Sequence, residues 1–182
     1  MADVLKVEIV TPTGLAVSRD AVELDVPTLG GEIGILPGHV PLLAAVRTGL
    51  VTLKPTATDD PVRFVVAHGV LEVTGEKALL LTEKFIKKED VDVVKTRARL
   101  RDVDEELNAW DGEINDPKRI ELIEEEQWLA AQLELIGDPP APTMRELTRF
   151  QVKDANVIIE AQTPDVLSDR AEAESDQPKT GQ

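Results

Sequence analysis

A fourteen-residue segment in the first quarter of the chain constrains its fold more than any other. Read from Gly30 to Leu43 the segment is GGEIGILPGHVPLL, with four glycines and two prolines among aliphatic residues. Glycine permits positive φ and close backbone approach, whereas proline fixes φ and removes an N–H donor. We therefore predict a loop, a short strand, a tight turn and a second strand. The plainest interpretation is a structured turn in an all-β domain.

The residues around this segment alternate between apolar and polar side chains, as half-buried strands do. The clearest alternation is at residues 22–26, where Val, Leu and Val are separated by Glu and Asp. Turn sequences, for example at residues 12–14 and 75–76, separate the strand-like runs. We predict an all-β sandwich or flattened barrel of about ten antiparallel strands over residues 1–87.

From residue 88 the apolar spacing changes to three and four, which indicates helices. Gly112 is expected to end the first helix, and Asp116 with Pro117 to begin the second as N-cap and first helical residue. We predict an α-helical hairpin over residues 88–137, which needs the sandwich or a partner to dock on because lone hairpins are marginal. The first apolar stripe is Val93, Thr96, Leu100, Val103, Leu107 and Trp110, and the second is Leu122, Leu129, Leu133 and Ile136.

Charge is concentrated in the hairpin region, where residues 89–137 carry 15 acidic and 6 basic side chains. The acidic residues 124–126 occupy successive helix positions, so we expect them on a solvated face. Lys95, Arg97, Arg99 and Arg101 point in different directions, and we expect them to pair with carboxylates three or four residues away. Residues 138–182 are predicted to be a partly disordered C-terminal extension, because proline and then acidic and polar residues dominate them.

Several functional classes do not fit the composition. The net charge of −15 leaves no basic surface for nucleic acid. Without cysteine and with two histidines, His39 and His68, there is little for thiol or transition-metal chemistry. No phosphate-binding glycine loop and no catalytic constellation is recognisable, so we do not expect an enzyme. The longest apolar run is about seven residues, against roughly 20 for a membrane span.

The chain resembles the epsilon subunit of the F-type, proton-translocating ATP synthase over about residues 3–137. The resemblance rests on VEIVTP at 7–12, GEIGILPGHVPLL at 31–43 and HGVLEV at 68–73. It implies a ten-stranded sandwich followed by a helical hairpin. It also implies a rotor subunit of the central stalk that couples the gamma subunit to the ring of c subunits and does no chemistry itself. Regulation of ATP hydrolysis is a candidate second role.

The resemblance further implies partners and a location. The expected partners are the gamma subunit and the c-ring, with the alpha and beta subunits as further candidates through the hairpin. The expected location is peripheral to the membrane, on the cytoplasmic face of the bacterial inner membrane or the stromal face in a plastid. By position in the motif, the candidates for contact with the rotor ring are Gly31, Glu32, Ile33 and Gly34, as a loop tip with Glu32 outermost. The candidates for packing in the stalk are Leu36, Pro37, His39 and Pro41.

Two departures from the family pattern affect what we expect of the hairpin. Family members that bind ATP resemble Ile/Leu-Asp-x-x-Arg-Ala at the start of the first helix, whereas residues 91–96 here are VDVVKT. Asp92 matches, but Lys95 and Thr96 replace Arg and Ala, which removes the planar guanidinium. We therefore expect no cofactor and weak or no ATP binding, with Asp92 and Lys95 as the remaining candidates. A free-standing nucleotide-binding regulatory module is the alternative function.

The second departure is electrostatic. The braking hairpin of the family offers basic residues to an acidic loop of the beta subunit, whereas residues 118–136 here carry five acidic and two basic side chains. Like charges that face one another at an interface are costly. We therefore expect this hairpin to brake ATP hydrolysis poorly.

Overall fold

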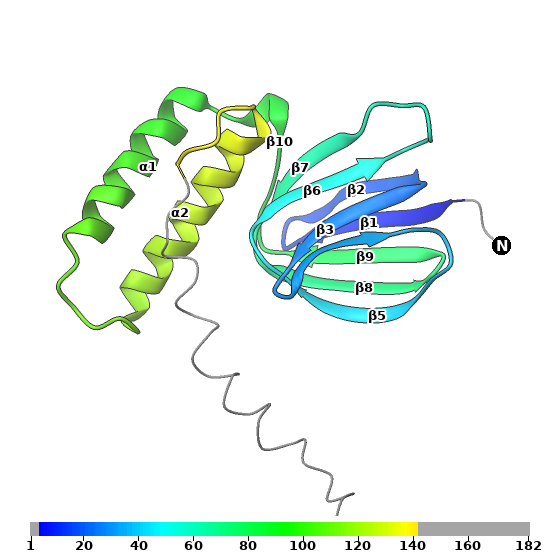
Figure 1. Ribbon diagram of the computed structural model, residues 1–182, viewed down its shortest axis with the longest axis horizontal. Helices are drawn as coiled ribbons and strands as arrows, with labels where there is room; N and C mark the ends of the chain where they lie inside the picture. Colours follow the sequence, from blue (N-terminus) through cyan, green and yellow to red (C-terminus); the bar gives the residue numbers. More distant parts are fainter. Residues whose placement is uncertain (1–3, 142–182) are drawn as a thin grey trace, which may run out of the picture. The chain divides into compact units, whose positions relative to one another are not determined.

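A computed structural model describes residues 4–141, in which ten strands are followed by a short 3-10 helix and two α-helices (Figure 1). This order confirms the predicted sandwich followed by a helical pair, and the strands end at Lys87. The predicted extension lies outside the described residues from 142 onward. The strands are β1 Leu5–Thr11, β2 Gly14–Ala21, β3 Glu23–Thr28, β4 Gly31–Ile35, β5 His39–Val46, β6 Gly49–Lys54, β7 Val62–Val66, β8 Gly69–Gly75, β9 Lys77–Thr82 and β10 Phe85–Lys87. The helices are η1 Lys88–Asp90, α1 Val93–Asn108 and α2 Pro117–Leu135.

The strands form one continuous sheet in the order β10-β7-β6-β3-β5-β8-β9-β1-β2, with β4 added on β3. The prediction of antiparallel strands is wrong for one pair, because β1 runs parallel to β9 with Val10 opposite Leu81. Neighbours joined by a tight turn must be antiparallel, but β1 and β9 lie near opposite ends of the domain's sequence, so no turn fixes their relative direction. β1 thus lies between β2 and β9 in the sheet (Figure 1).

The core of the sandwich is almost entirely aliphatic. Leu5, Val7 and Ile9 of β1 are fully buried, and the polar residues between them face outward. A tilted pair of rings, Phe64 and Phe85, lies at one end with centroids 5.3 Å apart. The alternation in the sequence is therefore the alternation between core and outer face.

The glycine-rich segment has the predicted sequence of a short strand, a tight turn and a second strand. β4 and β5 are separated by a turn at Pro37 and Gly38, and Gly38 has φ +80°. Positive φ is readily adopted only by glycine, which explains this residue at the turn.

The predicted loop tip at Gly31–Gly34 is wrong, because these residues belong to β4 and pair with β3. The turn lies earlier, at Leu29 and Gly30. The hydroxyl of Thr28 closes it by donating to the carbonyl oxygen of Gly31 at 2.6 Å and accepting from the amide of Gly30 at 3.2 Å. The side chain of Thr28, at the end of β3, thus stabilises a turn that is complete at Gly31, where β4 begins.

Capping residues set where the helices begin. Asp92 accepts a hydrogen bond from the amide of Lys95, and Asp116 accepts one from the amide of Lys118 with Pro117 in the first turn, which confirms the predicted start of α2. α1 ends at Asn108, four residues before the predicted stop at Gly112. α2 ends at Leu135, and Gly137 follows with φ +87°, as a glycine after a helix often does.

The two helices pack along the predicted stripes. The shared cluster consists of the buried residues Leu100, Val103, Leu107, Leu122, Leu129 and Leu133. Val93, Trp110, Ile123 and Ile136 pack partly buried around it.

A second face of α2 packs on the sandwich. Ala131 and Leu135 form a buried cluster with Val65 of β7, and Trp128 packs against its edge. The hairpin therefore docks on its own sandwich. Glu126 is only 3% exposed, so the expectation of a solvated face is wrong for this residue, because α2 is covered on two sides.

Candidate functional site

An apolar row crosses the outer face of five neighbouring strands. It consists of Ala45, Val70, Leu81, Val10 and Leu15, each opposite the next in the register of β5, β8, β9, β1 and β2. Leu15 is 61% exposed, Leu81 47% and Val70 41%. Contiguous exposed apolar side chains of this kind mark interaction surfaces more often than single ones do.

The same outer face is charged further along the strands. On β1, Lys6 and Glu8 precede Val10, and on β9, Lys77 precedes Leu81. Glu8 lies 2.7 Å from the Lys77 ammonium and 3.1 Å from that of Lys6, and these cations hold the pKa of Glu8 below its usual value. A paired charge cluster therefore bounds the apolar row on one side.

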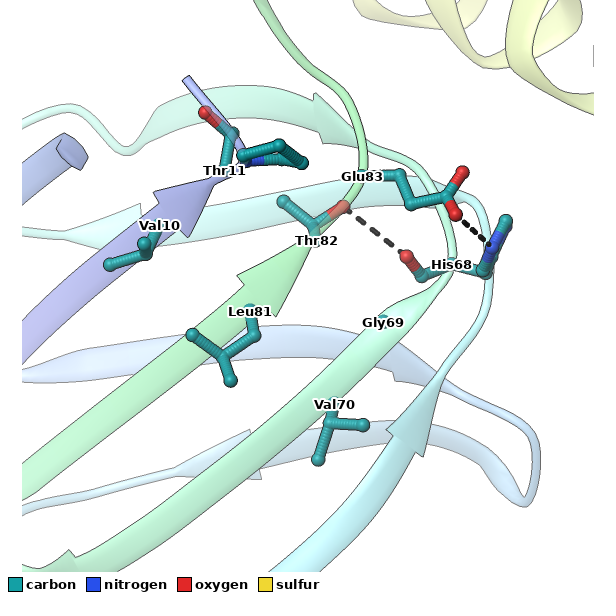
Figure 2. Close-up of a pocket in the computed structure, with 9 residues that line it drawn as sticks. Val10, Thr11, His68, Gly69, Val70, Leu81, Thr82 and Glu83 are labelled. Atoms are coloured by element: carbon teal, nitrogen blue, oxygen red, sulfur yellow. Dashed lines mark hydrogen bonds and ion pairs between the residues drawn. The ribbon is translucent and has the colours of Figure 1, made fainter. Parts of the chain in front are cut away.

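A shallow hollow of about 390 Å³ lies in the row (Figure 2). Val10, Leu81 and Val70 extend into it from three adjacent strands, as Figure 2 shows. At its rim the imidazole of His68 lies 3.4 Å from the carboxylate of Glu83. The hollow is thus shaped for an apolar side chain, with a polar pair at one end.

Gly69 is required at the edge of this hollow. A Cβ at this position would lie 2.0 Å from the carbonyl oxygen of Leu81. The neighbouring Thr82 hydroxyl lies 3.0 Å from the carbonyl oxygen of Ala67 and 3.4 Å from that of His68. Close approach of β8 to β9 therefore depends on a residue without a side chain.

The predicted ring-contact residues do not share one environment. Gly31, Glu32 and Gly34 are exposed, whereas Ile33 is half-buried and packs against the sandwich core. Alternation along β4 separates them, because Ile33 faces inward between neighbours that face outward.

Gly34 also accommodates a carboxylate on the neighbouring strand. A Cβ at Gly34 would lie 3.2 Å from the Oδ1 atom of Asp25. Burial, and then the nearby Glu23 and Glu32, raise the pKa of Asp25. This edge of β3 and β4 is therefore acidic, with Glu32 exposed on it.

The predicted stalk-packing residues lie at the surface around the turn into β5. Leu36 is 54% exposed and Pro41 is exposed, whereas Pro37 and His39 are half-buried. The Nδ1 atom of His39 lies 2.7 Å from the carbonyl oxygen of Val40. The structure adds two apolar residues to this region that the sequence analysis did not single out, Val40 at 71% and Leu43 at 75% exposure.

Asp92 and Lys95, the candidate nucleotide residues, are bound to each other. One carboxylate oxygen of Asp92 accepts from the amide of Lys95, and the other lies 3.1 Å from its ammonium. These contacts hold the pKa of Asp92 below its usual value. An N-cap with an adjacent ion pair accounts for both residues.

The basic residues of α1 are engaged in two different ways. Lys95 and Arg101 pair within their own helix region, as expected. For Arg97 and Arg99 that expectation is wrong, because they reach across the hairpin, Arg97 to Asp138 and Arg99 to Glu125. Arg99 donates two hydrogen bonds to Glu125, at 2.7 and 2.6 Å, and lowers the pKa of that carboxyl.

Two further observations concern the part of the chain from residue 4 to 141. No group of three or more His, Cys, Asp or Glu side chains there is placed to hold a metal ion. No helix within that range has the length and apolarity that a membrane span requires.

Sequence reasoning missed the apolar row, although a signal was present. Strict alternation fails at Ile9–Val10, Val70–Leu71 and Leu79–Leu81, where consecutive apolar residues put one side chain into the core and the next on the outer face. Such runs mark strands with two apolar faces. Only the register shows that these outer residues meet in one row.

Comparison with known proteins gives consistent matches. A family model described as the beta-sandwich domain of the ATP synthase delta/epsilon chain matches residues 4–88. The ATP synthase epsilon chain of Halalkalibacterium halodurans is 36% identical over 118 residues, which cover 65% of this chain and 87% of that relative. The ATP synthase epsilon chain of Aquifex aeolicus is 40% identical over 80 residues, covering 44% of this chain and 58% of the relative.

The fold also has a counterpart among solved structures. A chain in the cryo-EM structure of the Euglena gracilis mitochondrial ATP synthase, OSCP/F1/c-ring, superposes with a TM-score of 0.63 at 15% identity. The match covers 74% of this chain and 81% of that chain. It supports the fold of a sandwich followed by helices.

Proposed function

This chain belongs to the ATP synthase epsilon chain family, and from that premise we propose that it is a rotor subunit of the central stalk. In this role it binds the gamma subunit and the ring of c subunits and transmits rotation between them. It contributes no catalytic group of its own. The protein is peripheral to the membrane, on the cytoplasmic face in a bacterium or the stromal face in a plastid.

The apolar row carries this proposal. α2 packs on the outer face of β6, β7 and β10, through Leu50, Val65 and Ile86, and the row lies on other strands. Among residues 4–141, α2 therefore leaves Leu15, Leu81 and Val70 exposed for a partner, and the hollow beside Leu81 and Val70 accepts an apolar anchor. We assign this surface to the gamma subunit.

Two substitutions on the same face of β8 test the assignment. Val70→Asp puts a charge in the row, whereas Thr74→Asp puts the same charge at the polar end of the same strand. Val70→Asp should weaken binding to purified gamma subunit by about ten-fold or more, because a charge would be buried without a partner. Thr74→Asp should bind as the parent does. Unchanged binding by a folded Val70→Asp protein contradicts the assignment.

The exposed acidic edge at Glu32 is assigned to the ring of c subunits. The chain has no cysteine, so Glu32→Cys introduces a single thiol. In the assembled complex this thiol should cross-link to a loop of the c subunit. Free access of bulky thiol reagents to it in the intact complex speaks against this placement.

We propose that the isolated protein binds ATP weakly or not at all. Asp92 and Lys95 form an ion pair and a hydrogen bond with each other, and the guanidinium of the family motif is missing. Isothermal titration at millimolar ATP should show no saturable binding. A micromolar isotherm would instead favour a free-standing nucleotide-binding regulatory module.

Braking of ATP hydrolysis by this hairpin is proposed to be weak, since residues 118–136 carry an excess of acidic side chains. The test measures the ATPase rate of three complexes, which contain the full chain, the chain ending at Leu135 or the chain ending at Asp90. Both truncations should change the ATPase rate little. If the ATPase rate rises strongly only in the complex whose chain ends at Asp90, the hairpin is the brake and the electrostatic argument is wrong. If the ATPase rate already rises in the complex whose chain ends at Leu135, the brake lies in residues 136–182.

A further inference from the structure

Two ionisable side chains line the hollow in the apolar row. Of the nine residues around it, His68 and Glu83 can carry a charge, and the other seven are apolar residues, threonines or glycine. His68 lies between β7 and β8, and Glu83 lies between β9 and β10. Figure 2 shows their side chains next to each other at the rim, with Val70 and Leu81 along the hollow. An apolar anchor that fills the hollow therefore contacts this pair.

Backbone contacts hold the two side chains close together. The Nε2 atom of His68 lies 3.4 Å from the Oε1 atom of Glu83. The amide of Glu83 also donates to the carbonyl oxygen of His68, at 3.4 Å. Gly69, the next residue, brings β8 close to the carbonyl oxygen of Leu81. The imidazole and the carboxylate are thus neighbours because the chain segments that carry them are joined.

In the free protein, water reaches both members of the pair. The side chain of His68 is 48% exposed and that of Glu83 is 61% exposed. With a neutral imidazole the pair carries one negative charge, and with an imidazolium it carries none. Burial of an unpaired carboxylate is costly, whereas burial of a paired one costs less. Between pH 8 and pH 6 histidine is the side chain that ordinarily gains a proton, so the proton that neutralises the pair goes to the imidazole.

Other charged side chains lie near the hollow, and none of the following five lines it. Glu8, on the same outer face, is paired with Lys77. The ammonium of Lys84 lies over an indole ring of α2, and the guanidinium of Arg47 lies 3.5 Å from a main-chain carbonyl oxygen. Glu72 is exposed on the outer face of β8. Proton exchange that accompanies filling of the hollow is therefore expected at the rim pair.

We propose that a partner binds this surface with uptake of a proton by His68, so that binding becomes tighter as pH falls from 8 to 6. This inference rests on the proposed function, which assigns the row to the gamma subunit. The anchor of the partner displaces water from Glu83, and the imidazolium takes the place of that water. Because the complex holds the proton more tightly than the free chain does, the gain in affinity is complete at low pH and is lost as pH rises.

Isothermal titration of the full chain with purified gamma subunit tests this proposal. Titrations at pH 6, 7 and 8, each in two buffers of different ionisation enthalpy, give both the affinity and the number of protons exchanged. At pH 7 the parent should take up about half a proton per complex, and its affinity should rise about three- to ten-fold from pH 8 to pH 6.

Three substitutions locate the proton. His68→Gln keeps a polar side chain that cannot become charged, so it should bind with the same affinity at pH 6 and pH 8 and without proton uptake. Glu83→Gln should also remove the uptake, because no carboxylate then needs to be neutralised. Glu76→Gln removes an exposed carboxylate from the turn between β8 and β9, away from the hollow, and is the matched control. It should keep the uptake of the parent.

The outcomes separate this inference from the proposed function. Binding of the gamma subunit without proton uptake, or an uptake that persists in His68→Gln, overturns the inference and leaves the assignment of the row in place. If the parent does not bind the gamma subunit at any of the three pH values, the assignment is wrong and the inference is wrong with it.

Discussion

The sandwich and the hairpin of this chain are held together by different means. In the sandwich, 17 buried apolar residues from strands along the whole domain form one cluster. In the hairpin the corresponding cluster has six residues, and two arginine–carboxylate pairs cross it. The sandwich therefore has much more apolar burial to stabilise it, whereas the hairpin has less and also packs on the sandwich. Loss of one ion pair should therefore change the stability less than loss of a core side chain.

The largest effect is expected from removing a core leucine of the sandwich. Leu71 is fully buried, and Leu71→Ala should lower the free energy of unfolding by about 3–4 kcal/mol. Leu129→Ala in the hairpin, at a residue 8% exposed, should cost less, about 2 kcal/mol. Urea unfolding followed by circular dichroism measures both. Both tryptophans, Trp110 and Trp128, lie in the hairpin, so their fluorescence reports that region and, through Trp128, its contact with the sandwich. Equal costs would erase the contrast.

A backbone clash in the sandwich should come next. Gly69→Ala brings a Cβ within 2.0 Å of the Leu81 carbonyl oxygen, so β8 and β9 must separate, at a cost of about 2–3 kcal/mol. Gly30→Ala is the control, because its Cβ would meet Thr28 at an ordinary 3.8 Å. Thermal unfolding measures both variants. A melting temperature for Gly69→Ala near that of the control would show that the strand pair yields more easily than the structure implies.

The hairpin should respond to loss of one carboxylate charge. Glu125→Gln removes the partner of Arg99 and should destabilise the hairpin by about 0.5–1 kcal/mol, since both side chains are partly exposed. Arg99 lowers the pKa of Glu125 in the folded state from its ordinary 4.5. The stabilisation is therefore present above that value and lost as pH falls through the lowered pKa.

Tryptophan fluorescence between pH 7 and pH 3 checks this. The difference in unfolding midpoint between the parent and Glu125→Gln should shrink toward acid. Glu134→Gln, at an exposed carboxylate of the same helix, is the control. A difference that is independent of pH would mean that Glu125 acts through packing and not through charge.

The smallest effect should come from Asp25, a charge on the sandwich. Burial and then Glu23 and Glu32 raise the pKa of Asp25, so this carboxyl binds its proton more tightly in the folded protein than in the unfolded chain. The resulting stabilisation of the folded state is present below the unfolded pKa and is lost as pH rises through the folded pKa. Asp25→Asn, a neutral residue of the same shape, should therefore slightly raise the melting temperature at pH 7 and change little at pH 3. A lower melting temperature at pH 7 contradicts this.

Much of the fold could be predicted from local pattern. Alternation placed the strands, and Asp116 with Pro117 placed the start of α2, because these signals act over a few residues. The parallel pairing of β1 with β9 could not be predicted, since it joins segments about 70 residues apart. The Arg99–Glu125 contact was missed for the same reason, because local spacing favoured partners on the same helix.

The candidate site was only partly accessible from the sequence. The motif drew attention to residues 31–43, and the structure places several of them at the surface. The apolar row depends on register across five strands, and register is a property of the assembled sheet. The amino-acid sequence alone does not distinguish Val10 and Leu81 from the core residues of the same strands, and their outward orientation is seen only in the sheet.

The insertion of β1 between β2 and β9 has a consequence for the order in which the chain folds. Residues 6–10 pair with residues 77–81, so the ladder next to the last pair of the sheet closes a loop of about 70 residues. Loop closure over such distances makes folding slow, whereas the α1–α2 contacts are local and form fast. During synthesis, β1 and β2 can pair as soon as they emerge, but their next neighbour arrives only with β9. β1 and β2 are thus synthesised early but enclosed late, and the edge of β1 that will pair with β9 stays unpaired until then.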